Sequence, residues 1–377
     1  MKDILIFGAT INLSLTERNG IMKKVFAEAK ALSKDFDVYM WGFCDNHIVY
    51  FNNGTMVKVA PYANKAERRK TYFKELTAFA LKVKAKAFYF RYATVDFNLL
   101  RSLKAFKAAG MTNIIEIPTY PYKAEYMSTW KNRMIYTLDT LLRGQLKKYV
   151  SRVVNFTEQP KEIYGIPCII TMNGVDFSTI KPVKDPCLTP VTMIAISSML
   201  PMHGFDRLIS GVAKYLQEDG SRPIKVYIVG DGPKLISYKA LAERLHVGDS
   251  IKFTGQLSGK DLDEIFDKCA VAIGSLGLHR NGLTRLSTLK NREYVSRGLP
   301  VAYATSDNLL DTKPFSLILP SNDDPISIKD ILYFVDKMYS NPNINREIRE
   351  STFSLCDMSV TMQPVLDYLN EKLNKRF

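Results

Sequence analysis

This chain of 377 residues lacks the signatures of several protein classes. Its apolar runs stay below the roughly 18 residues of a membrane-spanning helix, and the run at residues 4–7 is too short for a signal peptide and predicts a buried first strand. The five cysteines are scattered and form no Cys-x-x-Cys pair, which favours reduced thiols in a cytoplasmic protein over disulfides or a structural zinc site. The four histidines form no His-Glu-x-x-His motif, so we expect no metal held by protein side chains.

Charge is the most marked bulk property. The chain carries a net charge of +14, which suits a nucleic acid, an anionic membrane surface or an anionic small substrate. No nucleic-acid-binding module is recognisable, and the charge is spread along the chain. We therefore favour a nucleotide diphosphate and an anionic membrane surface over nucleic acid as partners.

Strand and helix patterns alternate along both halves of the chain. The length exceeds what one compact core covers, so two domains are expected, with residues 172–190 as the candidate linker. The repeated strand–helix–strand rhythm predicts parallel sheets with helices on both faces. The principal expected helices lie at residues 21–33, 70–85, 95–109 and 125–148 in the first half, and at 204–218, 233–245, 258–268 and 288–298 in the second.

Residues 287–302 hold the most informative motif. A helix is expected to begin at Ser287 or Thr288 and to end at Gly298, where a left-handed residue is favoured. The free N–H groups and dipole of a helix N-terminus suit a phosphate, and Lys290 adds charge there. Glu293, one turn further on, can hold a diol such as ribose. This combination is what a nucleotide-sugar site needs, although an ordinary amphipathic helix before a strand remains the alternative.

This stretch resembles the donor-site helix of GT-B glycosyltransferases, in particular the retaining family-4 type. The resemblance implies an α/β chain with two doubly wound Rossmann-like domains that face each other across a cleft. Residues 1–172 would form the acceptor domain, with the helix at 361–377 packing back on it, and residues 173–360 the nucleotide-sugar donor domain. Lys290 would contact the diphosphate and Glu293 the ribose, and the donor set would also include Ser287, Thr288 and Leu289.

Further motifs match the same family. Asn173-Gly174-Val175-Asp176 resembles its domain-junction motif, and Val229-Gly230-Asp231-Gly232-Pro233 resembles a loop near the nucleotide base. Glycine lets a backbone approach a ligand closely, so Gly230 and Gly232 are assigned to the donor site, although a tight turn explains them equally well. Gly20, where a helix begins, is a weaker candidate for the donor phosphates.

The chain departs from the family pattern at three positions. Ser198 and His203 stand where the family has an Arg and a Lys that clamp the diphosphate, and Arg285 replaces the first of two carboxylates, of which Glu293 is the second. His203 can still donate to a phosphate. With Lys290, Glu293 and Arg285 it completes the set of residues to which we assign the chemistry.

The first domain supplies two further candidates. Thr119 and Tyr120 follow a predicted strand where the family often has a His, and we assign them to the acceptor site. The predicted helix at 125–148 carries an apolar stripe that we expect to be mostly core. Its basic residues and Trp130, together with Arg68, Arg69 and Lys70, suit contact with an anionic lipid surface.

The resemblance implies a metal-independent retaining glycosyltransferase. It would transfer a sugar from a nucleotide-diphosphate donor, with UDP-sugar favoured, to a saccharide or lipid-linked saccharide acceptor in the cytoplasm or at the inner face of the cell membrane. Two alternatives stay open. One is a sugar-nucleotide epimerase, and the other is a pseudo-enzyme that acts as partner of another glycosyltransferase, suggested by Ser198, His203 and Arg285.

Overall fold

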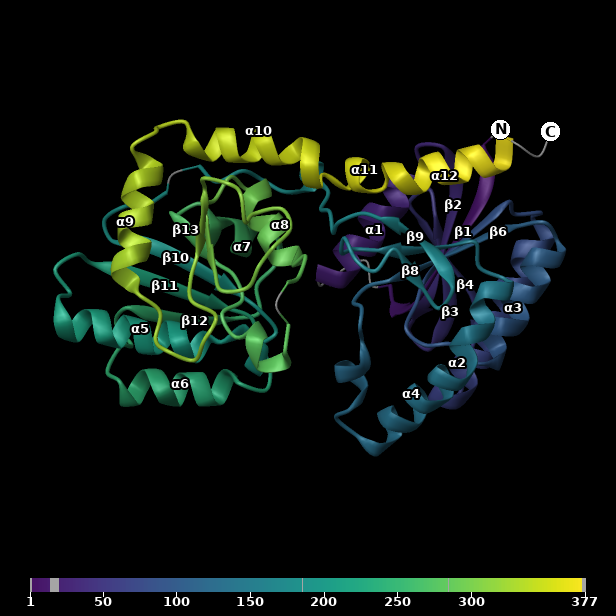
Figure 1. Cartoon of the computed structure of the whole chain (residues 1–377), viewed down its shortest axis with the longest axis horizontal. Coiled ribbons are helices and arrows are strands. Elements are labelled where there is room, and N and C mark those ends of the chain that lie inside the picture. Colours follow the sequence, from purple (N-terminus) through teal and green to yellow (C-terminus); the bar gives the residue numbers. More distant parts are fainter. Residues whose placement is uncertain (1, 14–19, 185, 284, 375–377) are drawn as a thin grey trace. The chain divides into compact units, whose positions relative to one another are not determined.

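The computed structural model describes residues 2–13, 20–184, 186–283 and 285–374. The backbone contacts divide the chain into two compact units. Unit 1 comprises residues 1–172 together with 358–377, and unit 2 comprises residues 173–357. Each unit is an α/β structure built on one main sheet (Figure 1). Among the described residues, no helix is both long and apolar enough to span a membrane.

Unit 1 contains a mixed sheet in the order β4-β3-β2-β1-β5-β6-β7-β9-β8. The central pairs from β2 to β9 are parallel, whereas β3, β4 and β8 pair antiparallel at the edges. Its strands are β1 (Asp3–Asn12), β2 (Phe36–Cys44), β3 (His47–Asn52), β4 (Thr55–Pro61), β5 (Ala87–Arg91), β6 (Thr112–Ile117), β7 (Arg152–Asn155), β8 (Glu162–Ile163) and β9 (Ile166–Ile170).

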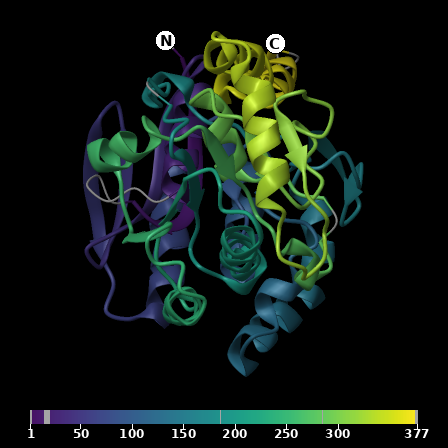
Figure 2. The same cartoon turned by 90° about the vertical axis from the view of Figure 1, so that its left-hand side faces the viewer.

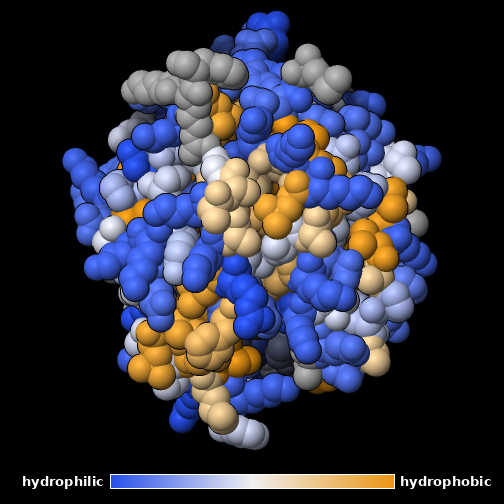
Figure 3. All heavy atoms as spheres, turned by 90° about the vertical axis from the view of Figure 1, so that its right-hand side faces the viewer, coloured by the Kyte–Doolittle hydropathy of each residue, from blue (hydrophilic) through white to orange (hydrophobic). Residues whose placement is uncertain are grey.

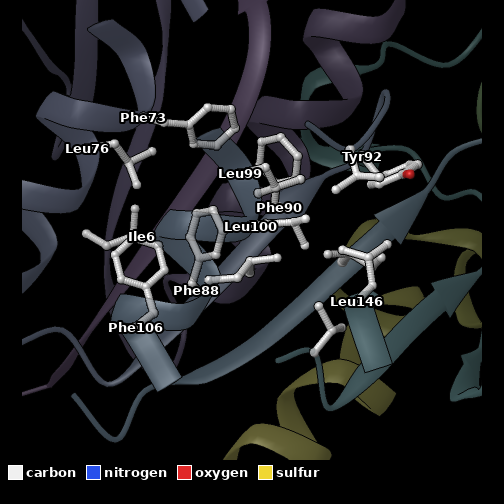
Figure 4. Packing of buried hydrophobic residues seen from close by; sticks show 14 of the residues in the cluster. Ile6, Phe73, Leu76, Phe88, Phe90, Tyr92, Leu99, Leu100, Phe106 and Leu146 are labelled. Atoms are coloured by element: carbon white, nitrogen blue, oxygen red, sulfur yellow. The ribbon is translucent and has the colours of Figure 1, made fainter. Parts of the chain in front are cut away.

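Helices cover both faces of this sheet. One face packs against α2 and α3 through an aromatic-rich core that includes Phe73, Phe88 and Phe106 (Figure 4). The other face packs against α1 and the C-terminal helices through residues such as Val25 and Val365. The helices are α1 (Gly20–Leu32), α2 (Lys65–Lys82), α3 (Phe97–Ala108), η1 (Lys123–Tyr126), α4 (Trp130–Leu142), η2 (Arg143–Lys148), α11 (Met358–Thr361) and α12 (Gln363–Asn374).

Unit 2 contains a parallel sheet in the order β12-β11-β10-β13-β14-β15. Helices α5 and α6 lie side by side (Figures 1 and 2), and α8 packs against α10. The strands are β10 (Val191–Ile196), β11 (Ile224–Val229), β12 (Ile251–Gly255), β13 (Val271–Ile273), β14 (Val301–Tyr303) and β15 (Ser316–Ile318). The helices are η3 (Phe177–Thr179), η4 (Pro201–His203), α5 (Phe205–Glu218), α6 (Leu235–Arg244), α7 (Gly259–Phe266), η5 (Leu278–Asn281), α8 (Leu289–Ser296), α9 (Ile328–Tyr339) and α10 (Ile344–Cys356).

The expected α/β class with two Rossmann-like sheets is confirmed. One expected element is wrong, because the single helix at 125–148 is broken into η1, α4 and η2. Thr129 stops the chain from continuing as one helix: its backbone is extended, and its side chain accepts a hydrogen bond from the Asn132 N–H at 3.2 Å as the cap of α4. The expected core stripe of that helix is also wrong, since most of its apolar residues are exposed.

Candidate functional site

The candidate site of unit 2 lies where three neighbouring strands end. A Cβ on Gly230 would lie 1.9 Å from the Ser197 carbonyl oxygen, and one on Gly232 would lie 2.0 Å from that of Ser198. Both glycines have positive φ angles, of 125° and 146°, a conformation that side chains rarely adopt. These glycines therefore let the loop after β11 pack directly on the loop after β10.

A second close backbone approach joins the loops after β10 and β13. Gly204 has a φ of 64°, and a Cβ there would lie 2.6 Å from the Gly277 nitrogen. Leu276 N–H donates to the His203 carbonyl at 3.0 Å. His203 is thereby held at the carboxyl edge of the sheet, which is where ligands bind in open parallel α/β sheets.

His203 and Lys290 come together at this edge. Lys290 Nζ lies 3.2 Å from His203 Nδ1, although 87 positions separate them in the chain. The other ring nitrogen, Nε2, lies 3.4 Å from Ser198 Oγ, and Ser275 Oγ lies 3.4 Å from Nδ1. Because an ammonium group can only donate, Nδ1 accepts from charged Lys290 and the ring proton sits on Nε2.

Burial favours the neutral forms of both Lys290 and His203. It lowers the pKa of Lys290 to about 7, and burial together with the Lys290 charge lowers the pKa of His203 to about 2. His203 is therefore neutral at pH 7, whereas Lys290 is poised between its two forms. No carboxylate among the described residues forms an ion pair with Lys290, so an incoming anion would supply the missing counter-charge.

The helix α8 begins next to this pair. Thr288 is its N-cap with extended backbone, but its side chain makes no capping bond, and its hydroxyl is buried with no hydrogen-bond partner among the described residues. Ser287 is engaged instead with the domain-junction motif: its Oγ accepts from the Asn173 N–H at 3.1 Å, and its carbonyl accepts from the Asn173 side chain at 2.7 Å. Leu289, the first residue of α8, carries one of the N–H groups that the helix leaves unpaired.

Among the described residues, and unlike Lys290, Glu293 forms an ion pair, whereas Arg285 is exposed. Glu293 Oε1 accepts from Arg297 at 3.2 Å, and Arg297 is also paired with Asp263 at 2.7 Å. Glu293 is thus already engaged by Arg297 within α8. Arg285 is exposed, and its backbone forms a bridge with Ser306. The turn that ends α8 is as expected, since Gly298 has a φ of 89°.

Three candidate residues, Gly20, Thr119 and Tyr120, lie in unit 1. Gly20 begins α1, and a Cβ there would meet nothing within 4 Å, so a close approach does not require glycine at this position. The residues just before it, 14–19, lie outside the described part of the chain. Thr119 lies near Glu125, whose pKa burial raises and Thr119 partly lowers. The Tyr120 ring packs edge-on against Tyr164, with 6.2 Å between the ring centroids.

Sequence reasoning missed a buried charge cluster in unit 1. Lys24 Nζ lies 2.7 Å from Glu116 Oε1 and 3.0 Å from Glu28 Oε1. Arg91 also pairs with Glu116, and the Tyr89 hydroxyl donates to it at 3.0 Å. Burial and the charge of Glu116 raise the pKa of Glu28. Burial alone would raise the pKa of Glu116 as well, but Lys24 and Arg91 lower it. A charged residue inside an apolar strand, and Lys24 four positions before Glu28, were the available signals.

No group of three or more potential metal ligands gathers within the part of the chain that the structure describes. Two Asp-x-Asp tripeptides occur in the sequence, at residues 35–37 and 261–263. In the first, Asp37 accepts from Asn52 at 2.8 Å and Asp35 accepts from Asn370 at 2.7 Å. In the second, Asp263 is bound by Arg297. These carboxylates serve structural contacts.

Part of unit 2 matches a known family. Residues 176–277 match the sequence model of the family described as Glycosyl transferases group 1, which supports a glycosyltransferase activity. The matched segment includes Ser198, His203, Gly230 and Gly232, and it ends before Lys290 and Glu293. No match to a curated protein sequence was found.

Solved structures with the same fold cover nearly the whole chain. Sucrose-phosphate synthase from Thermosynechococcus elongatus has a TM-score of 0.65 at 11% identity, covering 98% of this chain and 99% of that one. HepE from Anabaena, solved in complex with UDP, has a TM-score of 0.64 at 12% identity and covers 98% and 100%. WaaG, a glycosyltransferase involved in lipopolysaccharide biosynthesis, has a TM-score of 0.60 at 12% identity and covers 97% and 99%. At these identities the likeness shows the fold, which is that of GT-B glycosyltransferases.

Proposed function

We propose that this protein is a retaining glycosyltransferase that transfers a sugar from a UDP-sugar to a saccharide or lipid-linked saccharide acceptor, on the cytoplasmic side. Unit 2 binds the donor, and unit 1 binds the acceptor near Thr119 and Tyr120. The match to glycosyl transferases group 1 supports the reaction class. The neighbours solved with UDP or involved in lipopolysaccharide biosynthesis support the donor and the kind of acceptor.

The His203–Lys290 pair is the observation that carries this proposal. It forms a positive site to which no described residue supplies a carboxylate counter-charge, at the ligand-binding edge of a parallel sheet and beside the start of α8. A diphosphate has the charge that restores Lys290 to its protonated form. His203 Nε2–H and the unpaired N–H groups of α8 add neutral donors.

These groups act on the leaving UDP. As the bond between sugar and phosphate breaks, negative charge grows on the diphosphate, and fixed donors that already point at this charge lower the barrier. Glu293 accepts from the ribose hydroxyls while it keeps its contact with Arg297. In a retaining transfer the acceptor hydroxyl attacks from the face that the diphosphate leaves and passes its proton to the departing phosphate oxygen, so no separate general base is assigned. Because Lys290 and His203 meet the leaving charge, we expect turnover to survive excess chelator.

A thermal-shift and turnover experiment tests this function. UDP is expected to raise the melting temperature of the wild-type protein, because a ligand that binds only the native state stabilises it. Glu293→Ala should remove most of the shift, whereas the control Glu350→Ala, on the exposed surface of α10, should keep it. A Glu293→Ala variant that responds like wild type would show that the ribose role is wrong.

Turnover separates the remaining alternatives. Sugar transfer with retained anomeric configuration, insensitive to chelator, is the expected result. UDP binding without donor hydrolysis or transfer would indicate a pseudo-enzyme, and a changed donor sugar without any acceptor would indicate an epimerase. Loss of turnover in chelator that magnesium or manganese restores would overturn the metal-free assignment.

A further inference from the structure

Helix α4 of unit 1 turns its apolar side chains outward. Its exposed face carries large hydrophobic residues, and the exposed fractions reach 74% for Trp130, 73% for Leu141 and 62% for Met134. Ile135 and Leu138 extend the same surface. Figure 3 shows the resulting apolar patch at the lower left of the molecule, over α4. Contiguous apolar surface of this kind marks a contact site rather than chance exposure.

The inner face of α4 explains this orientation. Asp139 is fully buried, accepts from the Tyr122 hydroxyl at 2.6 Å and from the Val95 N–H at 2.8 Å, and is also bonded by the Tyr92 hydroxyl. A carboxylate with three donors is satisfied in the interior. Asp139 thus anchors the helix to unit 1, while Leu138 and Leu141 face outward, which is the reverse of an ordinary surface helix.

The charges around this patch identify its occupant. Lys131 and Arg133 are exposed on α4, and Lys147 and Lys148 are exposed on the following η2. The segment 123–148 holds six basic residues and two acidic ones, and one of the acidic residues is the buried Asp139. Two copies of this face would bring like charges together. An anionic lipid surface meets the apolar and the basic residues at once, and tryptophan favours such an interface.

We propose that α4 docks this protein on anionic membranes, lying in the plane of the surface with Trp130, Met134, Leu138 and Leu141 inserted among the lipids. The helix has 13 residues, fewer than the roughly 20 that would cross a bilayer. The proposal does not depend on Arg68 and Arg69, which have partners within unit 1: the guanidinium of Arg68 stacks on Phe43 at 4.6 Å, and Arg69 binds Asp96 at 2.7 Å. The docking is independent of the proposed transfer reaction.

Tryptophan fluorescence gives a direct test. The chain has two tryptophans; Trp41 is fully buried and Trp130 is exposed. Vesicles of phosphatidylglycerol mixed with phosphatidylcholine should shift the emission to shorter wavelength, and pure phosphatidylcholine should shift it much less. Trp130→Phe should abolish the shift, whereas Trp41→Phe should retain it. An unchanged emission spectrum, or an equal response to both kinds of vesicle, would overturn the proposal.

Co-sedimentation with the same vesicles tests the insertion. Leu141→Ser should weaken binding at least roughly tenfold, because burial of a leucine is lost. Ile236→Ser removes an apolar side chain of 82% exposure from α6 in unit 2 and should bind like wild type. Lys131→Ser with Arg133→Ser should reduce the preference for anionic lipid. Unchanged melting temperatures and UDP responses would show that these variants keep their fold and donor site.

Light scattering tests the alternative that the patch is an interface between two copies of the chain. If the patch joins two copies of the chain, the wild-type protein will dimerise with increasing concentration, and Leu141→Ser will be monomeric. That result, or vesicle binding that Leu141→Ser leaves unchanged, would contradict docking on lipid through α4.

Discussion

The two units place charge differently at the carboxyl ends of their strands. In unit 1, Lys24 and Arg91 pair with Glu116, and the side chains of Lys24 and Glu116 are buried. In unit 2, Lys290 faces a neutral histidine and has no carboxylate partner among the described residues. Charges that neutralise one another hold a structure together, whereas an uncompensated cation is available to an anion. The comparison supports a structural role for the first cluster and the proposed donor binding for the second.

The largest expected effect is on the unit 1 cluster. Glu116→Gln leaves Lys24 and Arg91 without their shared carboxylate, and breaking a buried ion pair costs about 3–5 kcal/mol. Denaturant unfolding should show this loss. Glu28→Gln is the matched control and should cost less, because burial already favours the protonated form of Glu28. Equal losses in the two variants would mean that the cluster has no central carboxylate.

Removing the charge of Lys290 in unit 2 should reduce UDP binding and leave stability unchanged. Lys290→Met is expected to weaken UDP binding roughly 10- to 150-fold, since hydrogen bonds to charged groups are worth about 1.5–3 kcal/mol, without lowering the melting temperature of the free protein. Calorimetric titration measures the first effect and thermal unfolding the second. Lys337→Met, on the exposed side of α9, should change neither. A destabilised Lys290→Met protein would place Lys290 with the structural cluster instead.

The loops that carry this site should be sensitive to a single methyl group. Gly230→Ala places a Cβ against the Ser197 carbonyl at a φ of 125°, and a strained residue of this kind costs about 1–3 kcal/mol. Both stability and UDP affinity should fall. Gly248→Ala is the control, because a Cβ there meets nothing within 4 Å. A Gly230→Ala protein as stable as the control would mean that the two loops can separate without cost.

Periodic patterns predicted most helices and strands, but they predicted elements better than contacts. The hairpin of β3 and β4 was missed although Asn53-Gly54, with φ angles of 45° and 83°, is a recognisable turn signal. The apolar stripe of α4 follows a helical period equally well whether it faces a core or solvent. The burial of Asp139 and the exposure of Trp130 and Leu141 show that it faces outward.

In the candidate site, too, the sequence predicted individual motifs better than the contacts between them. The motifs around His203 and Lys290 could be recognised one by one, whereas their distance of 3.2 Å depends on how two loops fold. Glu293 was considered alone, although Arg297 four positions later was a readable partner on the same helix.

The smallest expected effect is the pH dependence of UDP binding. The pKa of Lys290 is lowered to about 7 in the free protein, and a bound diphosphate should raise it, so binding above pH 7 takes up a proton. The dissociation constant should then rise by up to about tenfold per pH unit above 7. The terminal phosphate of UDP, with a pKa near 6 like other phosphate monoesters, is already ionised there. Lys290→Arg should give a flat profile, since arginine keeps its charge.

The stability of the free protein should rise above pH 7, the range in which UDP binding weakens. Between pH 7 and the ordinary lysine value the unfolded chain binds a proton that native Lys290 lacks, so this residue makes the free protein more stable as pH rises. The difference between wild type and Lys290→Arg isolates this contribution from the other titrating groups. Tighter UDP binding with rising pH, or identical profiles for the two proteins, would show that Lys290 keeps its charge in the free protein.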